Sequence, residues 1–202
     1  MRVKICGITN KNDAVFAETS GADAVGVVIS EESKRNVTPD KAKEIFSALG
    51  PFVSTVIVTH TESEEEMREI AEVNPSAIQV SADVRIPDSY RGKIIRVVSD
   101  NVHNPEDLPK NCNALIIDSS RGEGKEFNRN FAEEVIRHSK VPVILAGGLN
   151  PENVSDAIRK LSPYAVDVCS GVEESPGIKD RFLILDFLKA AGKLPVLKRK
   201  KL

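Results

Sequence analysis

Short runs of β-branched and aliphatic residues recur along the chain, and helical periodicity separates most of them. Eight runs predict strands: Val3–Cys6, Ala24–Ile29, Val53–Thr59, Ala77–Val80, Ile94–Val98, Ala114–Asp118, Val143–Ala146 and Ala165–Val168. Six stretches predict helices: Asp13–Ser20, Pro39–Leu49, Glu64–Val73, Phe131–Ser139, Pro151–Leu161 and Arg181–Ala191. Strand followed by helix is the repeating unit, and eight units of about 25 residues approach the lower size limit of a closed (β/α)8 barrel.

Two connections between predicted strands lack a regular helical pattern. Residues 85–91 and 101–111 contain prolines and little periodicity, so we expect short or degenerate helices there. Elsewhere, helix starts are marked by Thr38 before Pro39, by the Ser63 and Glu66 capping box, and by Asn150 before Pro151.

One set of alternate strand positions is aliphatic and the other is polar. The aliphatic set, expected to pack against helices, comprises Val3, Ile5, Ile78, Val80, Ile95, Val97, Leu115, Ile117, Val166 and Val168. The opposite set comprises Lys4, Cys6, Gln79, Arg96, Asp118, Asp167 and Cys169. A doubly wound sheet favours apolar residues on both faces, whereas a barrel can hold polar groups inside, near its C-terminal mouth. We therefore predict an α/β protein with a closed, parallel, eight-stranded (β/α)8 TIM barrel of near-minimal length.

Composition limits the partners and the compartment. The chain has 202 residues, 28 of them basic and 30 acidic, and its formal net charge of −2 lacks the basic surplus typical of nucleic-acid binding. No apolar run approaches the ~20 residues of a membrane span, and Met1 is followed by a short strand-like segment rather than by a charged head and apolar core, so we expect no signal sequence. We expect a cytoplasmic protein without nucleic-acid or membrane partners, with one catalytic domain over residues 1–192 and a basic tail over 193–202.

The cysteines indicate neither disulfides nor a metal. Cys6, Cys112 and Cys169 are odd in number and far apart, which fits no disulfide framework and no metal-ligand spacing. The motifs of metalloproteases, α/β-hydrolases and P-loop proteins are missing as well. We therefore expect no metal.

Glycine-containing segments follow the last two predicted strands. The first contains Gly147 and Gly148, and the second contains Ser170 and Gly171. In a barrel, the loops after strands seven and eight can present backbone N–H groups to a phosphate, because glycine permits close approach. The glycines could instead make tight turns only, but their occurrence in both loops favours a phosphate site at these four residues.

Cys6 and Asp118 end the first and sixth predicted strands and are expected to face the same mouth of the barrel. A thiolate near positive charge is a competent general base, and a carboxyl group kept neutral by burial is a competent general acid. The two groups could therefore act on different atoms of one substrate. Two alternatives stay open: Cys6 as an inert buried thiol, and Asp118 as the ion-pair partner of Arg96 inside the barrel.

Six segments are distinctive: Val3–Thr9 (VKICGIT), Gly21–Gly26 (GADAVG), Ser33–Arg35 (SKR), Gly147–Val154 (GGLNPENV), Ala165–Glu173 (AVDVCSGVE) and Pro176–Asp180 (PGIKD). Together they resemble the phosphoribosylanthranilate isomerase family over residues 1–191. The resemblance implies an isomerase of tryptophan biosynthesis. Such an enzyme converts N-(5-phosphoribosyl)anthranilate to 1-(2-carboxyphenylamino)-1-deoxyribulose 5-phosphate by an Amadori rearrangement, without cofactor or metal. The implied partner is a small phosphorylated ribose that carries anthranilate.

The resemblance also assigns roles to individual residues. Cys6 would remove the C2′ proton as general base, and Asp118 would protonate the ribose ring oxygen as general acid. Arg35 would help to place the anthranilate end through its charge. Gln79 and Asp167 would line the substrate pocket. The positions that match the family's phosphate-binding backbone amides are Gly148, Ser170 and Gly171.

Two segments depart from the family's pattern. Ser81 follows the fourth predicted strand where the family has His, and residues 121–129 keep Phe127 but lose the Asp and the aromatic residue that follow it in the family. A non-catalytic phosphosugar-binding barrel is one alternative, but such a protein would need neither a base nor an acid. A related phosphoribosyl Amadori isomerase of histidine synthesis is the other, and it would require a second anion site in the opposite half of the barrel.

Overall fold

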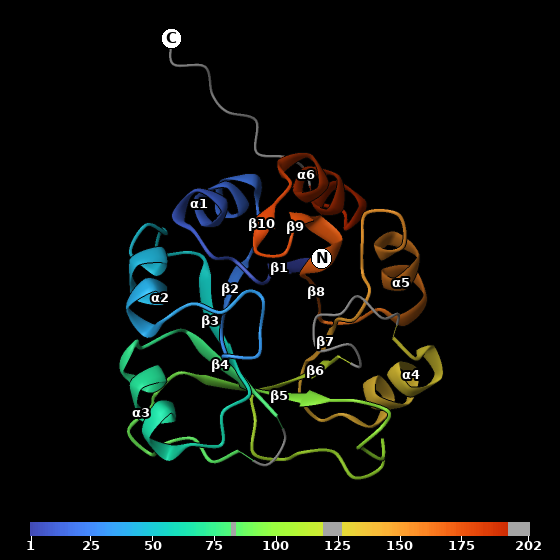
Figure 1. Ribbon diagram of the computed structural model, residues 1–202. Coiled ribbons are helices and arrows are strands. Elements are labelled where there is room, and N and C mark those ends of the chain that lie inside the picture. Colours follow the sequence, from blue (N-terminus) through green and yellow to red (C-terminus); the bar gives the residue numbers. More distant parts are fainter. Residues whose placement is uncertain (82–83, 119–126, 194–202) are drawn as a thin grey trace.

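Eight parallel strands close into a barrel in their sequence order, with β8 paired to β1 (Figure 1). The structure is a computed structural model that describes residues 1–81, 84–118 and 127–193. The barrel strands are β1 (Arg2–Ile5), β2 (Ala24–Ile29), β3 (Ser54–Thr59), β4 (Ala77–Val80), β5 (Lys93–Val98), β6 (Ala114–Ile117), β7 (Val143–Leu145) and β8 (Ala165–Val168). The predicted fold is therefore confirmed.

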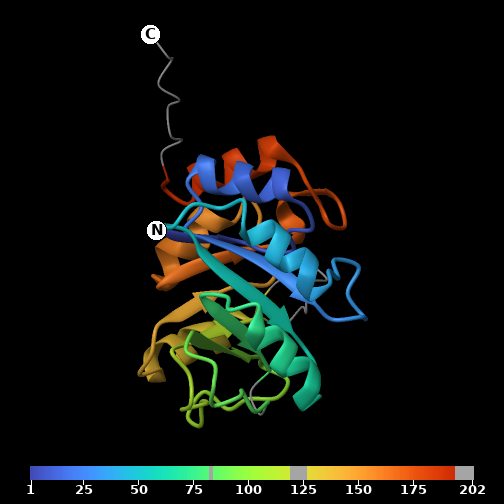
Figure 2. The same ribbon diagram turned by 90° about the vertical axis from the view of Figure 1, so that its left-hand side faces the viewer.

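Helices cover the outside of the barrel (Figures 1 and 2). In the described part of the chain they are α1 (Lys11–Ser20), α2 (Pro39–Phe46), α3 (Glu64–Glu72), α4 (Arg129–His138), α5 (Val154–Leu161) and α6 (Arg181–Ala190). Thr38 and Ser63 cap α2 and α3 as predicted, since their hydroxyl oxygens accept hydrogen bonds from the N–H groups of Lys41 and Glu66. No helix among the described residues is long and apolar enough to cross a membrane.

The chain between β8 and α6 forms a short 3₁₀ helix and a hairpin. The 3₁₀ helix is η1 (Ser170–Val172), and the hairpin pairs β9 (Glu173–Ser175) with β10 (Ile178–Lys179). Thr9 Oγ1 donates a hydrogen bond to the Gly177 carbonyl at 2.5 Å. This bond holds the hairpin against the loop that follows β1.

Helix α5 begins later than predicted. The sequence places its start at Pro151, but the helix begins at Val154. Asn150 Oδ1 accepts the N–H groups of Glu152 and Asn153 at 2.9 and 3.1 Å, and Asn153 Oδ1 accepts the N–H of Asn150 at 2.9 Å. The two amide side chains thus stabilise a turn here. Regular helix follows only after this turn.

Loops cover the side of the barrel between α3 and α4 (Figure 1). The sequence predicts short or degenerate helices in the connections from β4 to β5 and from β5 to β6, but the described parts of both contain turns only. Tyr90 Oη donates a hydrogen bond to the Pro75 carbonyl at 2.9 Å. Leu108 and Cys112 pack against the core from the second connection. These side chains take the place of a helix.

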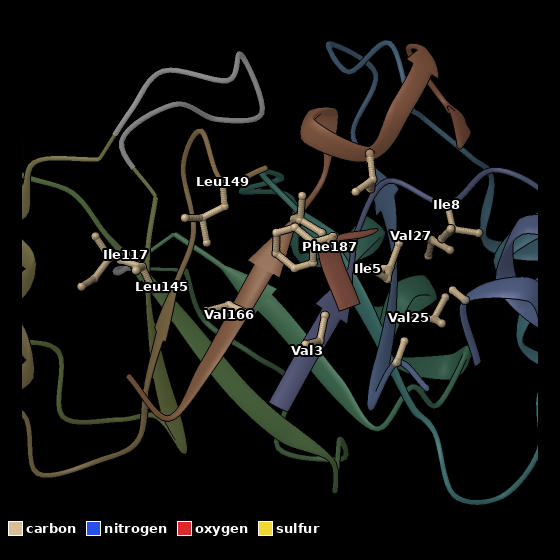
Figure 3. Close-up of a cluster of buried hydrophobic side chains, with 14 of the residues drawn as sticks. Val3, Ile5, Ile8, Val25, Val27, Ile117, Leu145, Leu149, Val166 and Phe187 are labelled. Atoms are coloured by element: carbon tan, nitrogen blue, oxygen red, sulfur yellow. The ribbon is translucent and has the colours of Figure 1, made fainter. Parts of the chain in front are cut away.

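The core has two layers, one outside the barrel strands and one inside. In the outer layer, Phe187 of α6 lies among Val3, Ile5 and Val166 of β1 and β8 (Figure 3). The inner layer consists of Val56, Ala77, Ile95, Ala114, Ile116, Ile144, Ala146 and Ala165. Several of these residues are the first of their strands, so apolar side chains fill the interior toward the N-terminal ends of those strands.

The prediction of which residues face inward is wrong for β5. Arg96 is expected inside the barrel, yet it pairs laterally with Val80 and Leu115, which belong to the outer layer. Ile95 belongs to the inner layer. Arg96 therefore lies on the outer face, buried, where its Nη1 donates a hydrogen bond to the Ser81 carbonyl at 2.9 Å. The predicted faces are confirmed for β1, β4, β6 and β8.

Candidate active site

Lys4, Gln79 and Asp167 meet inside the barrel from β1, β4 and β8. Lys4 Nζ donates a hydrogen bond to Gln79 Oε1 at 2.8 Å and lies 3.1 Å from Asp167 Oδ1. None of the three residues is more than 7% exposed. A buried ammonium group is stable only when it is paired and hydrogen-bonded, and these contacts meet both conditions.

The charges of this group depend on one another. Burial raises the pKa of Asp167 to about 7, although the charge of Lys4 opposes the shift. Burial by itself would lower the pKa of Lys4, but the charges of Asp167 and Cys6 outweigh it and hold this pKa above its ordinary value. Lys4 is therefore a constant cation inside the barrel, while Asp167 changes its protonation near neutral pH.

Cys6 lies next to Cys169, directly beyond the ends of β1 and β8. The N–H of Cys6 donates to the Val168 carbonyl at 2.8 Å, which continues the pairing of the two strands. The hydrogen bond from Cys169 lowers the pKa of Cys6, and the charges of Lys4 and Lys179 lower it further, although burial opposes them. The same hydrogen bond and burial raise the pKa of Cys169. The structure therefore favours a thiolate at Cys6 and a thiol at Cys169.

Arg35, Glu173 and Lys179 form an ion-pair group beside the thiols. Arg35 donates to both carboxylate oxygens of Glu173, at 2.8 and 2.6 Å, and Lys179 Nζ lies 2.8 Å from Glu173 Oε1. Burial would raise the pKa of Glu173, but the hydrogen bond from Arg35 and the charge of Lys179 leave it below its usual value. Arg35 is thus held in place by Glu173, with its Nη1 not used in this pair.

The loops after β7 and β8 lie against each other. Gly147 and Gly148 have φ angles of 87° and 65°, which residues with a Cβ atom rarely adopt. A Cβ on Gly171 would overlap the backbone oxygen of Leu149, so only glycine permits this approach of the two loops. Asn153 Nδ2 donates to the Gly148 carbonyl at 2.9 Å. The expected phosphate-binding residues therefore come together at one place.

Two adjoining cavities open at the C-terminal end of the barrel. Cys6, Arg35, Gln79, Asp118 and Asp167 all line the larger cavity. The smaller one is lined by Asp118, Ala146, Gly147, Gly148, Leu149, Asp167, Val168, Cys169 and Ser170. The structure thus brings together all the predicted site residues, with Gly171 behind the cavity wall at Leu149.

Three further points concern Ser81, the residues that the structure does not describe, and groups that could hold a metal ion. Ser81 lines the larger cavity at the position where the family has His. Gly122, Gly124 and Lys125 in the loop after β6 lie outside the described residues, as does the tail from residue 194. Within the described ranges, no three His, Cys, Asp or Glu side chains form a group that could hold a metal ion.

No role for Cys169, Glu173 or Lys179 follows from the sequence alone. The sequence does indicate that Cys169 faces the barrel interior, because Cys169 belongs to the polar set of alternate strand positions. Glu173 and Lys179 occur in segments that resemble the family. Their meeting depends on the β9–β10 hairpin, which folds back over the end of β1 through a contact that no local pattern predicts.

Comparison with known proteins agrees with this geometry. The N-(5′-phosphoribosyl)anthranilate isomerase of Methanoregula boonei is 52% identical over 193 residues, which cover 95% of this chain and 96% of that protein. The crystal structure of phosphoribosyl anthranilate isomerase from Thermus thermophilus superposes with a TM-score of 0.84 at 35% identity and covers 95% of this chain and 98% of its own.

A second similar structure contains a ligand. It is phosphoribosyl anthranilate isomerase in complex with reduced 1-(o-carboxyphenylamino)-1-deoxyribulose 5-phosphate, with a TM-score of 0.77 and 35% identity over 95% of this chain and 98% of that one. The family model described as N-(5′-phosphoribosyl)anthranilate (PRA) isomerase matches residues 3–190. With a match over nearly its whole length and relatives at this identity, the chain belongs to the phosphoribosylanthranilate isomerase family.

Proposed function

We propose that this enzyme converts N-(5′-phosphoribosyl)anthranilate to 1-(2-carboxyphenylamino)-1-deoxyribulose 5-phosphate in tryptophan biosynthesis, with Cys6 as general base and Asp118 as general acid. The observation that carries the proposal is that both residues line one cavity, although they follow two non-adjacent strands, β1 and β6. Family membership and the similar structure with a bound product analogue support the choice of substrate.

Substrate and product are isomers, so the reaction moves two protons without net gain: one from the 2′-hydroxyl to the ring oxygen and one from C2′ to C1′. Asp118 gives its proton to the ribose ring oxygen as the bond from that oxygen to C1′ breaks, and the nitrogen lone pair forms the C1′=N bond. The Cys6 thiolate then removes the proton on C2′, which yields an enolamine. In the tautomerisation to the 2-ketone, C1′ gains a proton and the 2′-hydroxyl loses one, so that Cys6 and Asp118 return to their starting protonation states and no oxidant or reductant is consumed.

The remaining lining residues hold the two ends of the substrate. Backbone N–H groups of the two glycine loops, at Gly147, Gly148, Ser170 and Gly171, would bind the phosphate. Arg35 would attract the anthranilate carboxylate through the nitrogen that Glu173 does not use. Gln79 and Asp167 would form the floor of the pocket. A phosphorylated biosynthetic intermediate also agrees with the expected cytoplasmic location.

The test is loss of turnover in Cys6→Ser and in Asp118→Asn. Each substitution is expected to reduce kcat by at least ~10², the usual effect of losing a general acid or base, with an unchanged circular dichroism spectrum. The assay follows the decay of anthranilate-type fluorescence after addition of freshly generated phosphoribosylanthranilate. Cys112→Ser is the matched control, because Cys112 packs against the outer core and not in the cavity.

The outcomes separate the candidate functions. Wild-type activity in both variants would refute the assigned mechanism. A wild-type protein without turnover that is still thermally stabilised by phosphate would instead be a phosphosugar-binding barrel.

A further inference from the structure

The thiols of Cys6 and Cys169 are confined side by side at the mouth of the barrel. A Cβ on Gly7 would lie 2.6 Å from Cys169 Sγ, and a Cβ on Gly26 would lie 2.9 Å from Cys6 Sγ. Only glycine at these two neighbouring positions leaves room for the sulfur atoms. Cys6 and Cys169 are the residues directly after Ile5 and Val168, which are paired between β1 and β8. The register therefore places the two residues side by side, and the neighbouring glycines leave room for their sulfur atoms.

Lys179 places a buried cation against this thiol pair. Its side chain is 0% exposed, and Nζ donates to the Cys169 carbonyl at 3.0 Å and to Glu173 Oε1 at 2.8 Å, with Cys169 Sγ 3.9 Å away. The backbone N–H of Lys179 donates to Asp13 Oδ2 at 3.1 Å, which ties β10 to α1. The ammonium group is thus held at this place by both side-chain and backbone contacts.

The charges around Lys179 leave one positive charge to be balanced. Glu173 is the ion-pair partner of both Arg35 and Lys179, so these three groups together carry a net charge of +1. A buried net charge is costly unless a counter-charge lies beside it. A thiolate on the Cys6–Cys169 pair supplies that counter-charge.

Other charged groups face Cys6 from the surrounding elements. Lys4 of β1 favours the thiolate, while Asp167 of β8 opposes it to the extent that it is ionised. Asp118, directly after β6, lines the same cavity. Arg35, in the loop between β2 and α2, favours negative charge on both sulfurs.

We propose that Cys169 and Lys179 are positioning residues for the base: the Cys169 thiol donates its S–H to the Cys6 thiolate, and the buried Lys179 ammonium keeps the negative charge on this pair. The proposal rests on the role of Cys6 in the proposed function. During the reaction Cys6 accepts the C2′ proton, while Cys169 keeps its own proton throughout.

The experiment titrates the thiols without substrate. The rate at which iodoacetamide alkylates Cys6 is measured against pH by site-resolved mass spectrometry, with ultraviolet thiolate absorbance as a second readout. Cys169→Ala removes the donor and Lys179→Met removes the charge. Each is expected to raise the titration midpoint of Cys6 by about one to three pH units. Cys169→Ser and Lys179→Arg keep a donor or a charge and are expected to restore part of the shift.

Matched controls exclude general effects. Cys112→Ser removes the third thiol, and Lys41→Met removes an exposed lysine that is paired to Glu44 on the surface. Both controls are expected to leave the midpoint of Cys6 unchanged. In Cys169→Ala and Lys179→Met, the acidic limb of the pH profile of kcat/KM is expected to shift to higher pH together with the titration midpoint of Cys6.

An unchanged midpoint in a folded Cys169→Ala protein overturns the proposal. If Lys179→Met does not fold, the comparison of Cys169→Ala with Cys169→Ser still decides it. Because the titration needs no substrate, its result is independent of turnover. The expected thiol shifts in a protein without isomerase activity would refute the proposed function but support the arrangement of charge around the pair.

Discussion

Asp167 shows at the residue scale how one buried carboxyl group links the site to stability. Its side chain is 3.1 Å from Lys4 Nζ, and its pKa is raised by burial from 3.8 to about 7. The folded protein therefore binds the proton on Asp167 more tightly than the unfolded chain does. The stability that this proton contributes is fully present below about pH 4 and is lost as the pH rises through 7.

Asp167→Asn is expected to remove this pH dependence. The free energy of unfolding of the wild type, taken relative to the variant, is expected to fall by at least about 1 kcal/mol between pH 4 and pH 7. Urea titrations at several pH values measure this difference, and Cys6 is present in both proteins. Parallel pH profiles for the two proteins would contradict the raised pKa.

At the scale of single elements, β5 shows where the alternation of polar and apolar residues misleads. A buried arginine in a strand suggests the polar interior, yet Arg96 lies on the outer face, where loops replace a covering helix. Such a position can accept a long guanidinium group that reaches a loop carbonyl, here that of Ser81. Proline content predicts that these connections lack regular helices. Proline content does not predict that the outer face of β5, covered by loops and not by a helix, holds a polar side chain.

Arg96→Met tests the corrected orientation. The substitution leaves the Ser81 carbonyl without this donor and is expected to lower the free energy of unfolding by about 1–3 kcal/mol. Because Arg96 does not line the cavity, kcat is expected to stay unchanged. Urea denaturation and the fluorescence assay measure the two effects. The control is Arg68→Met, which removes an exposed ion pair with Glu64. A selective loss of activity in Arg96→Met would place the side chain inside the barrel after all.

At the scale of the whole molecule, closure of the barrel depends on packing between the two ends of the chain. Strands β1 and β8 pair over four residues, and α6 covers them with Phe187, which is fully buried. The same pairing brings the ends of these strands, and so Cys6 and the loop after β8, to one mouth. Stability of the closed barrel and assembly of the site are therefore connected.

Phe187→Ala is expected to destabilise the protein by about 3–5 kcal/mol, because it leaves a cavity between α6 and the two strands. Phe52→Ala is the matched control: Phe52 is 99% exposed, and its removal is expected to change stability by less than about 0.5 kcal/mol. Thermal and urea unfolding measure both. Similar losses in the two variants would show that α6 contributes no more than surface packing.

Much of this architecture can be predicted from the sequence, and what cannot has physical reasons. Strand runs, the inward set on four strands, and the placement of Cys6, Asp118 and the glycine loops follow from local periodicity and strand order. The start of α5 is missed because the Asn150 and Asn153 side chains satisfy backbone donors in a turn. The partners of Arg35 and Cys169, which are Glu173 and Lys179, are missed because they come from a hairpin whose position is fixed only by tertiary contacts.

The pairing of β1 with β8 also bears on when the chain becomes chemically active. Cys6 precedes Cys169 by 163 residues and Lys179 by 173 residues, so it is synthesised well before them. A growing chain on the ribosome therefore carries Cys6 as an ordinary thiol, without its partners. In the proposed arrangement, the thiolate at Cys6 forms only after Lys179 has emerged and the barrel has closed, so shorter nascent chains do not carry it.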